Sequence, residues 1–129
     1  METKREVLQA KKAPPAIGPY SLGIRSSDLL FISGTLGMDP EKGEMVQGGI
    51  EAETRQALMN LEQILIAGGS SLKHVVKTTV FMRDLAEFPV MNTIYAGFFP
   101  EDPPARSTVQ VARLPKDAAV EIEAIAIKA

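Results

Sequence analysis

The chain has 129 residues, of which 45% are hydrophobic and 23% are charged, and its formal net charge is −2. This length and composition predict one soluble globular domain over residues 1–129 and exclude a disordered chain. The nearly balanced charge argues against a nucleic-acid surface, and the absence of cysteine excludes disulfides, thiolate metal sites and a cysteine nucleophile.

The first twelve residues are rich in charge and lack the apolar stretch of a secretory signal. No apolar run in the chain approaches the roughly 20 residues that a membrane-spanning helix needs. We therefore expect a cytoplasmic protein that makes no membrane contact.

The first third of the chain reads as short strands and loops. Residues 5–9 form a possible strand, and residues 11–19 form a loop with three prolines. Two strand-like runs, residues 20–25 and 29–33, flank a plausible hairpin turn. Residues 34–49 are rich in glycine and predict a long loop or an irregular hairpin.

Two helices are expected in the middle of the chain. Residues 51–67 carry leucines at helical spacing and end at a Gly-Gly pair, and Glu51 and Glu53 suit the positive N-terminal end of that helix. Residues 88–98 carry large apolar side chains at spacings of three and four, with Pro89 in the first turn.

Three more strands follow from β-branched and alternating runs. Residues 74–82 are apolar and β-branched, which favours a strand between the two helices. Residues 106–112 and 119–128 predict a closing hairpin around a Leu-Pro-Lys-Asp turn. The order of elements predicts an α+β domain with one sheet of about six strands and two helices on one face.

The last strand has apolar residues on both of its faces. Val120 and Ile122 point to one side, whereas Ile125 and Ile127 point to the other, so both faces of the sheet should be covered. Two helices cover one face of a sheet of this size. We expect a second copy of the chain to cover the other.

Two charged residues near the C-terminus suit the chemistry of a small carboxylic acid. Arg106 could hold a carboxylate with two parallel hydrogen bonds. Glu121 could exchange protons with water if it is partly buried. From the residues alone, Arg106 could equally be a surface ion-pair residue, Glu121 could be a solvated side chain, and Glu123 would serve the pattern as well as Glu121.

Other catalytic motifs are missing from the sequence. His74 is the only histidine, and no H-x-x-x-H spacing accompanies it, so we expect no catalytic metal. Neither a phosphate-binding P-loop nor a dinucleotide-binding glycine pattern occurs, and we expect no cofactor. We interpret the six scattered methionines as core residues.

Six short motifs span almost the whole chain in a fixed order: GPYS at 18–21, ISG at 32–34, HVVKTTV at 74–80, N-x-x-Y-x-x-F-F at 92–99, P-A-R-S-x-V-x-V-A-x-L-P-K-D at 104–117 and V-E-I-E-A-I-A at 120–126. Together, and above all in the closing segment, they resemble the RidA/YjgF/UK114 family. The resemblance implies a chorismate-mutase-like fold of the bacillus type with one mixed sheet. It also implies a homotrimer whose active sites lie between subunits.

The same resemblance implies an enzyme. Its best-defined members hydrolyse 2-iminobutanoate and 2-iminopropanoate to 2-keto acids and ammonia, without a cofactor. These imines come from enamines that pyridoxal-phosphate-dependent dehydratases release. By this resemblance, Arg106 would hold the substrate carboxylate, and Glu121 would position water and relay protons.

The resemblance also implies five residues that line the cleft: Tyr20, Ser33, Gly34, Asn92 and Thr108. Each has an ordinary alternative, since the tyrosine could be packing, Ser33-Gly34 a turn and Asn92 an exposed helical residue.

Three positions depart from the commoner family pattern. Thr108 replaces a frequent cysteine, so thiol-based regulation is impossible there, while the proposed chemistry does not need a thiol. Leu22 and Thr35 replace frequent glutamines. These two changes bear on substrate preference more than on the type of reaction.

Two other functions stay open at this point. The same cleft could bind 2-keto acids without catalysis, because an arginine alone suffices for that. Some members of the family are described as translation inhibitors with ribonuclease activity. The balanced charge and the single histidine argue against RNA cleavage here.

Overall fold

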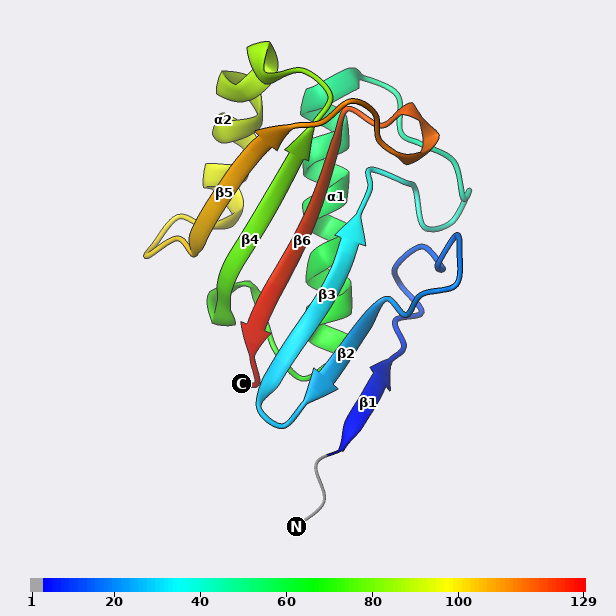
Figure 1. The fold of residues 1–129 in the computed structure, drawn as a ribbon, viewed down its shortest axis with the longest axis vertical. Helices are drawn as coiled ribbons and strands as arrows, with labels where there is room; N and C mark the ends of the chain where they lie inside the picture. The colour runs from blue at the N-terminus through cyan, green and yellow to red at the C-terminus, as the bar shows by residue number, and fades with distance from the viewer. Residues whose placement is uncertain (1–3) are drawn as a thin grey trace.

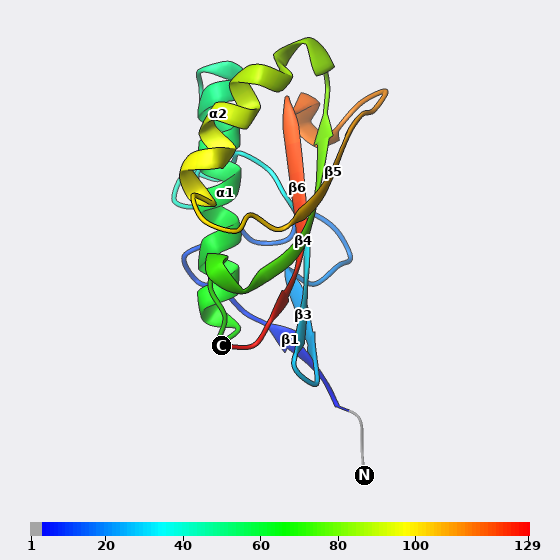
Figure 2. The same cartoon turned by 90° about the vertical axis from the view of Figure 1, so that its left-hand side faces the viewer.

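The computed structural model describes residues 4–129, which form a mixed six-stranded sheet with two α-helices on one face (Figures 1 and 2). The expectation for the charged segment 1–12 falls partly on residues 1–3, which lie outside the described residues. The α-helices are α1 (Gly49–Ala67) and α2 (Phe88–Phe98). The strands are β1 (Arg5–Leu8), β2 (Gly23–Ser26), β3 (Leu29–Thr35), β4 (Val75–Met82), β5 (Ala105–Gln110) and β6 (Val120–Ile127).

The strand order in the sheet is β1-β2-β3-β6-β4-β5. β4 and β5 are parallel, and α2 makes the crossover between them, whereas every other neighbouring pair is antiparallel. The prediction of an α+β fold with one mixed sheet and two helices on one face is therefore confirmed. Figure 2 shows both helices packed on the same side of the sheet.

The predicted closing hairpin is wrong. β5 and β6 do not pair, because β4 lies between them, and β5 is the edge strand of the sheet (Figure 1). β6 alternates small and aliphatic residues that fit a buried central position, while β5 (ARSTVQ) is largely polar and suits an edge. Closeness in sequence favours a hairpin, but here the burial of β6 between β3 and β4 decides the pairing.

The strand predicted over residues 20–25 starts later than expected. The backbone N–H of Tyr20 donates to the carbonyl of Gly18 at 2.8 Å, which closes a tight turn, and β2 begins only at Gly23. β3 extends past the predicted residue 33 to Thr35, with a register shift between Ile32 and Thr35. Ser33 and Gly34 therefore lie in a strand irregularity rather than after the strand.

The core lies between the sheet and the helices. Leu58, Leu61 and Leu65 of α1 are fully buried, and each stabilises the fold by about 2 kcal/mol through burial alone. They pack with the alternate residues of β6 that face the helices, Val120 and Ile122 among them. The predicted alternation of β6 is confirmed.

The opposite face of the sheet is partly apolar and open in the single chain. Leu29, Phe31, Val109 and Ile127 are between 39% and 43% exposed, although each is a large apolar residue. That a second copy of the chain covers this face stays a prediction.

Within residues 4–129, neither helix combines the length and apolar character that crossing a bilayer would require. The expected cytoplasmic location stays a prediction.

Candidate active site

Glu121 lies on the open face of the sheet, close to the start of β6. A Cβ atom built on Gly34 would lie 2.6 Å from both Cδ and Oε2 of Glu121, so the carboxyl group rests directly on the Gly34 backbone. Tyr20, Ser33, Gly34 and Glu121 line one groove of about 320 Å³. The structure thus brings four of the seven predicted site residues together.

The environment of Glu121 changes its acidity. Burial raises the pKa of its carboxyl group, since the charged form loses solvation, and the negative charge of Glu123 raises the pKa further. A carboxyl group with a raised pKa is a better base once ionised. Such a group can take a proton from water and return it within one reaction cycle.

Ser33, which was expected to line the cleft, makes two hydrogen bonds within the chain. Its hydroxyl donates to the carbonyl of Ser21 at 2.6 Å, and its backbone N–H donates to the carbonyl of Leu22 at 3.0 Å. Both donors of Ser33 are therefore committed within the chain. They tie the Tyr20 segment to β3, which makes Ser33 a residue that shapes the groove.

The Tyr20 side chain is 44% exposed and folds back on its own turn. Its hydroxyl oxygen accepts a hydrogen bond from the backbone N–H of Ile17 at 3.2 Å. Because both residues line the groove beside Glu121, this turn forms one wall of it.

Arg106 belongs to a second group, formed by β5 and α2. Its Nη2 donates to Oδ1 of Asn92 at 2.7 Å, and its guanidinium carbon lies 4.7 Å from the ring centre of Tyr95 and 5.5 Å from that of Phe88. An amide and two aromatic rings hold the guanidinium in one orientation. A fixed guanidinium is pre-organised for a carboxylate.

Thr108 lies two residues after Arg106 on the same face of β5. Its Oγ1 is buried and has no hydrogen-bond partner among the described residues. An unpaired buried hydroxyl is costly, so this position is suited to a further polar partner.

The two groups lie on opposite faces of the sheet in one chain. Arg106 pairs with Thr78, which in turn pairs with the buried Ala124, so all three face the helices. Glu121 is three residues before Ala124 and points the other way, because side chains alternate along a strand. A single chain therefore does not bring Arg106 and Glu121 together.

The sequence of the whole chain has clear relatives. A profile of the family described as Endoribonuclease L-PSP matches residues 10–128. The chain belongs to the RidA/YjgF/UK114 family. The expected family membership is confirmed.

Three similar proteins illustrate the breadth of this family. Reactive Intermediate Deaminase A of Arabidopsis thaliana is 50% identical over 95% of this chain and 66% of that protein. The human 2-iminobutanoate/2-iminopropanoate deaminase is 47% identical over 96% of this chain and 90% of that protein. The crystal structure of RidA from an Antarctic Psychrobacter superposes with a TM-score of 0.92 at 42% identity, covering 95% of this chain and 98% of that one. The predicted chorismate-mutase-like fold is confirmed by such neighbours.

Two buried polar residues of α1 hold the chain segments around Glu121, and the sequence did not predict this role. Oε1 of Glu53 accepts a hydrogen bond from the backbone N–H of Ala119 at 2.9 Å, two residues before Glu121. Nδ2 of Asn60 donates to the carbonyls of Leu36 and Met38, which follow Gly34. α1 thus holds both chain segments that carry the Glu121 groove.

A signal for these residues was present in the sequence. Glu53 and Asn60 lie seven residues apart, in the same helical stripe as the buried Ala57 and Ile64. Glu53 was expected to act at the helix N-terminus, but it is buried and bonds to the neighbouring segment instead. Glu51 is exposed and pairs with Arg55 at 3.5 Å.

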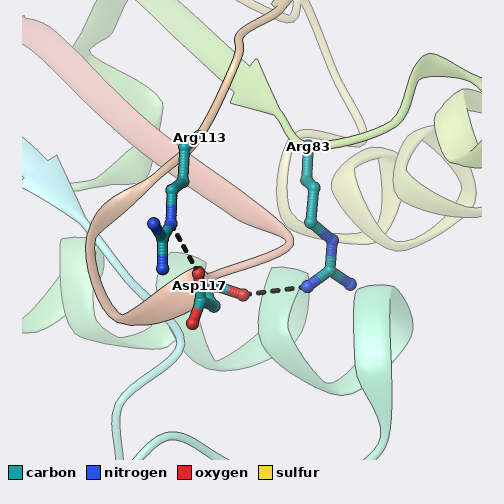
Figure 3. A network of polar contacts seen from close by, with 3 residues as sticks. All are labelled: Arg83, Arg113 and Asp117. Atoms are coloured by element: carbon teal, nitrogen blue, oxygen red, sulfur yellow. Dashed lines mark hydrogen bonds and ion pairs between the residues drawn. The ribbon is translucent and has the colours of Figure 1, made fainter.

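The turn before β6 is held from two sides (Figure 3). Nε of Arg113 donates to Oδ1 of Asp117 at 2.8 Å, and Nη1 of Arg83 donates to the backbone carbonyl of Asp117 at 2.9 Å. The Arg113 guanidinium lowers the pKa of the Asp117 carboxyl, since it stabilises the charged form. These exposed contacts support the left-handed conformation of Lys116 and Asp117 that turns the chain into β6.

The expectation that this RidA-family chain uses no catalytic metal stays a prediction. Across the part of the chain that the structure describes, no three His, Cys, Asp or Glu side chains are grouped to hold a metal ion. His74, the only histidine, is bonded through Nδ1 to Ser71 Oγ at 2.7 Å in the turn before β4.

Proposed function

We propose that this protein hydrolyses 2-imino acids, including 2-iminobutanoate and 2-iminopropanoate, to 2-keto acids and ammonia without a cofactor. The observation that carries the proposal is the half-buried Glu121 carboxyl group, with its raised pKa, in a groove beside Tyr20 and Gly34. The curated names of relatives that are 46% to 50% identical support the same reaction.

In the proposed reaction Glu121 relays a proton twice. Ionised Glu121 takes a proton from water as the water oxygen bonds to C2 and the C=N electron pair moves to nitrogen, and it passes this proton to the nitrogen, which gives a tetrahedral 2-amino-2-hydroxy acid. Glu121 then takes the hydroxyl proton and passes it to the nitrogen as the C–N bond breaks, so the keto carbonyl forms and ammonia leaves. Arg106 holds the carboxylate throughout through charge-assisted hydrogen bonds.

The proposal requires at least two copies of the chain at each site. Arg106 and Glu121 face opposite sides of the sheet, so Arg106 of one copy must meet Glu121 of another. The open sheet face offers large, partly exposed apolar residues for such an assembly. A homotrimer with three sites between subunits fits both features, and the unpaired hydroxyl of Thr108 would lie beside Arg106 at each site.

A coupled assay tests the activity. A threonine dehydratase generates the imine, and keto-acid formation is followed with and without this protein. We expect the wild type to accelerate keto-acid formation and Arg106→Ala to abolish the acceleration while the oligomeric state is unchanged. Normal turnover by Arg106→Ala would exclude the assigned role of this residue.

Mixed assemblies test whether Arg106 and Glu121 at one site come from different subunits. Arg106→Ala and Glu121→Gln chains are co-expressed with different affinity tags and purified through both tags. In a mixed trimer, about one site in three regains both wild-type residues if the site lies between subunits. Each variant alone stays inactive, and a mixed trimer without activity would contradict a shared site.

A second candidate is a binding protein for 2-keto acids that does no catalysis. The pre-organised Arg106–Asn92 pair favours it, because a guanidinium held in one orientation can bind a carboxylate without any proton transfer. Binding of a keto acid without turnover of a freshly generated imine would identify this function.

The family description also contains the word endoribonuclease. RNA cleavage that survives purification and is lost in Glu121→Gln would support a ribonuclease function.

A further inference from the structure

Tyr95 of α2 links Arg106 to a buried hydroxyl group that the proposed reaction does not use. The Tyr95 hydroxyl shares a hydrogen bond of 2.7 Å with Oγ1 of Thr78, which is fully buried in β4. The centre of the Tyr95 ring lies 4.7 Å from the guanidinium carbon of Arg106. Thr78 and Arg106 are direct partners across the parallel strands β4 and β5. Tyr95 therefore contacts two neighbouring side chains of the sheet, one through its hydroxyl group and the other through its ring.

The residues that surround the guanidinium come from one side of α2 and its C-terminal end. They are spaced by four, three and four residues, as neighbours along a helix face are: Phe88, Asn92, Tyr95 and Phe99. The ring centre of Phe99 lies 4.7 Å from that of Tyr95, and both side chains are buried. The Tyr95 ring is therefore held by Phe99 at its side and by Thr78 at its hydroxyl group.

Tyr95 keeps its proton in this environment. Burial raises the pKa of its hydroxyl group, and this effect exceeds the opposing effects of the bond to Thr78 and the positive charge of Arg106. A neutral ring attracts a guanidinium through its face and leaves the charge of that guanidinium uncancelled. A phenolate would instead compete with a carboxylate for Arg106. The Arg106 charge therefore stays available for a substrate.

We propose that Tyr95 and Thr78 are positioning residues for the Arg106 guanidinium. The bond between the two hydroxyl groups fixes the Tyr95 ring, the ring fixes the plane of the guanidinium, and Asn92 fixes its rotation within that plane. A guanidinium has more N–H donors than the bond to Asn92 uses, so donors remain for a substrate carboxylate. The inference rests on the proposed function, because it assumes that Arg106 binds that carboxylate.

The two hydroxyl groups can be removed singly or together. Tyr95→Phe keeps the ring and Thr78→Val keeps the side-chain shape, but each leaves the other hydroxyl buried without its partner. Each single variant should therefore unfold at a lower temperature than the wild type. The double variant removes both hydroxyl groups and should regain much of that stability, because no partner is left unpaired.

The double variant separates a positioning role from a merely structural one. If the hydroxyl pair only stabilises the fold, recovered stability should bring normal kinetics. If the pair positions Arg106, we expect KM for 2-iminobutanoate to stay raised by about tenfold, with kcat within about twofold of the wild type. The substrate carboxylate does not react, so weaker binding of it raises KM more than it lowers kcat. A wild-type KM in the double variant would overturn the proposal.

Two further variants serve as controls. Thr78→Ser keeps a hydroxyl group for Tyr95 and should retain a KM close to that of the wild type. Thr54→Val makes the Thr-to-Val exchange at another fully buried threonine, whose Oγ1 has no hydrogen-bond partner among residues 4–129. It should change neither KM nor the unfolding temperature. A KM in Thr78→Ser as high as in Thr78→Val would show that the hydroxyl group is not what positions Arg106, and would contradict the proposal.

A binding experiment separates this inference from the proposed function. The keto acid 2-ketobutanoate is titrated into the wild type and the double variant, and its affinity is measured by calorimetry. Binding that is about tenfold weaker in the double variant supports the positioning role even if no imine is turned over. Turnover of imines with unchanged KM and unchanged affinity supports the deaminase and excludes the positioning role. Neither binding nor turnover by the wild type would exclude both.

Discussion

The carboxyl group of Glu121 lies on the backbone of Gly34, so closely that a Cβ atom at position 34 would lie 2.6 Å from its Cδ and Oε2. Gly34 does not have a positive φ angle, so its backbone conformation does not require glycine. The requirement comes from the close approach of Glu121 alone. The packing of these two residues therefore determines where the proposed base can act.

We expect Gly34→Ala to lower the catalytic rate while the fold stays stable. The added methyl group displaces the end of a flexible side chain, so the fold is expected to tolerate it. A displacement of about 1 Å at a catalytic group can lower the rate by about 100-fold, and we expect a fall of that order in kcat. Gly97→Ala is the control, since a Cβ there meets nothing within 4 Å. Both variants are compared in the imine assay and by thermal unfolding, and wild-type kcat in Gly34→Ala would contradict the assignment.

The pH dependence of the reaction should report the raised pKa of Glu121. Only the ionised carboxylate can take a proton from water, so kcat/KM should fall on acidification at a pH above the usual glutamate range. Glu123→Gln removes the neighbouring negative charge, which lowers the pKa of Glu121 and moves the fall to lower pH. The measurement is kcat/KM across the pH range for both proteins. An unchanged profile would show that Glu123 does not influence the base.

Asn92→Asp tests the Arg106 pair without removing the arginine. A carboxylate at position 92 would bond to the Arg106 guanidinium and compete with the substrate carboxylate. Hydrogen bonds to charged groups contribute about 1.5 to 3 kcal/mol, so we expect KM to rise by about 10-fold or more. Thr93→Ala, one residue further along the same helix, is the control and should keep wild-type KM. An unchanged KM in Asn92→Asp would place the substrate carboxylate elsewhere.

Glu53 should act on stability and on the placement of Glu121 through the backbone of Ala119. Glu53→Ala leaves a buried N–H without an acceptor, which is expected to cost about 1 to 3 kcal/mol of unfolding free energy. Glu53→Gln keeps an acceptor oxygen and should restore most of that stability. Urea unfolding at equal protein concentration measures the difference, and kcat, more than KM, should follow the same order. Equal losses in both variants would indicate that the negative charge matters rather than the hydrogen bond.

The sequence predicted both helices and most of the strands, and it predicted which side of β6 faces the core. α2 runs from Phe88 to Phe98 as predicted, because Pro89 favours its first turn and Pro100 ends it. The alternation of β6 predicted its buried and open faces, since side chains alternate along any strand. The family motifs predicted the fold and the candidate residues.

Apart from the hairpin of β2 and β3, the sequence did not predict which strands are neighbours in the sheet. Strand pairing depends on contacts between residues far apart in the chain, so the local pattern could not show that β4 separates β5 from β6. The same pairing places Arg106 and Glu121 on opposite faces, which the linear spacing of the two residues conceals. The sequence predicted that Glu53 interacts with the N-terminal end of its helix. In the structure Glu53 is buried and accepts a hydrogen bond from the backbone N–H of Ala119. A sequence pattern indicates whether a residue is buried or exposed. The hydrogen-bond partner of a buried polar group depends on which segments pack together in the fold.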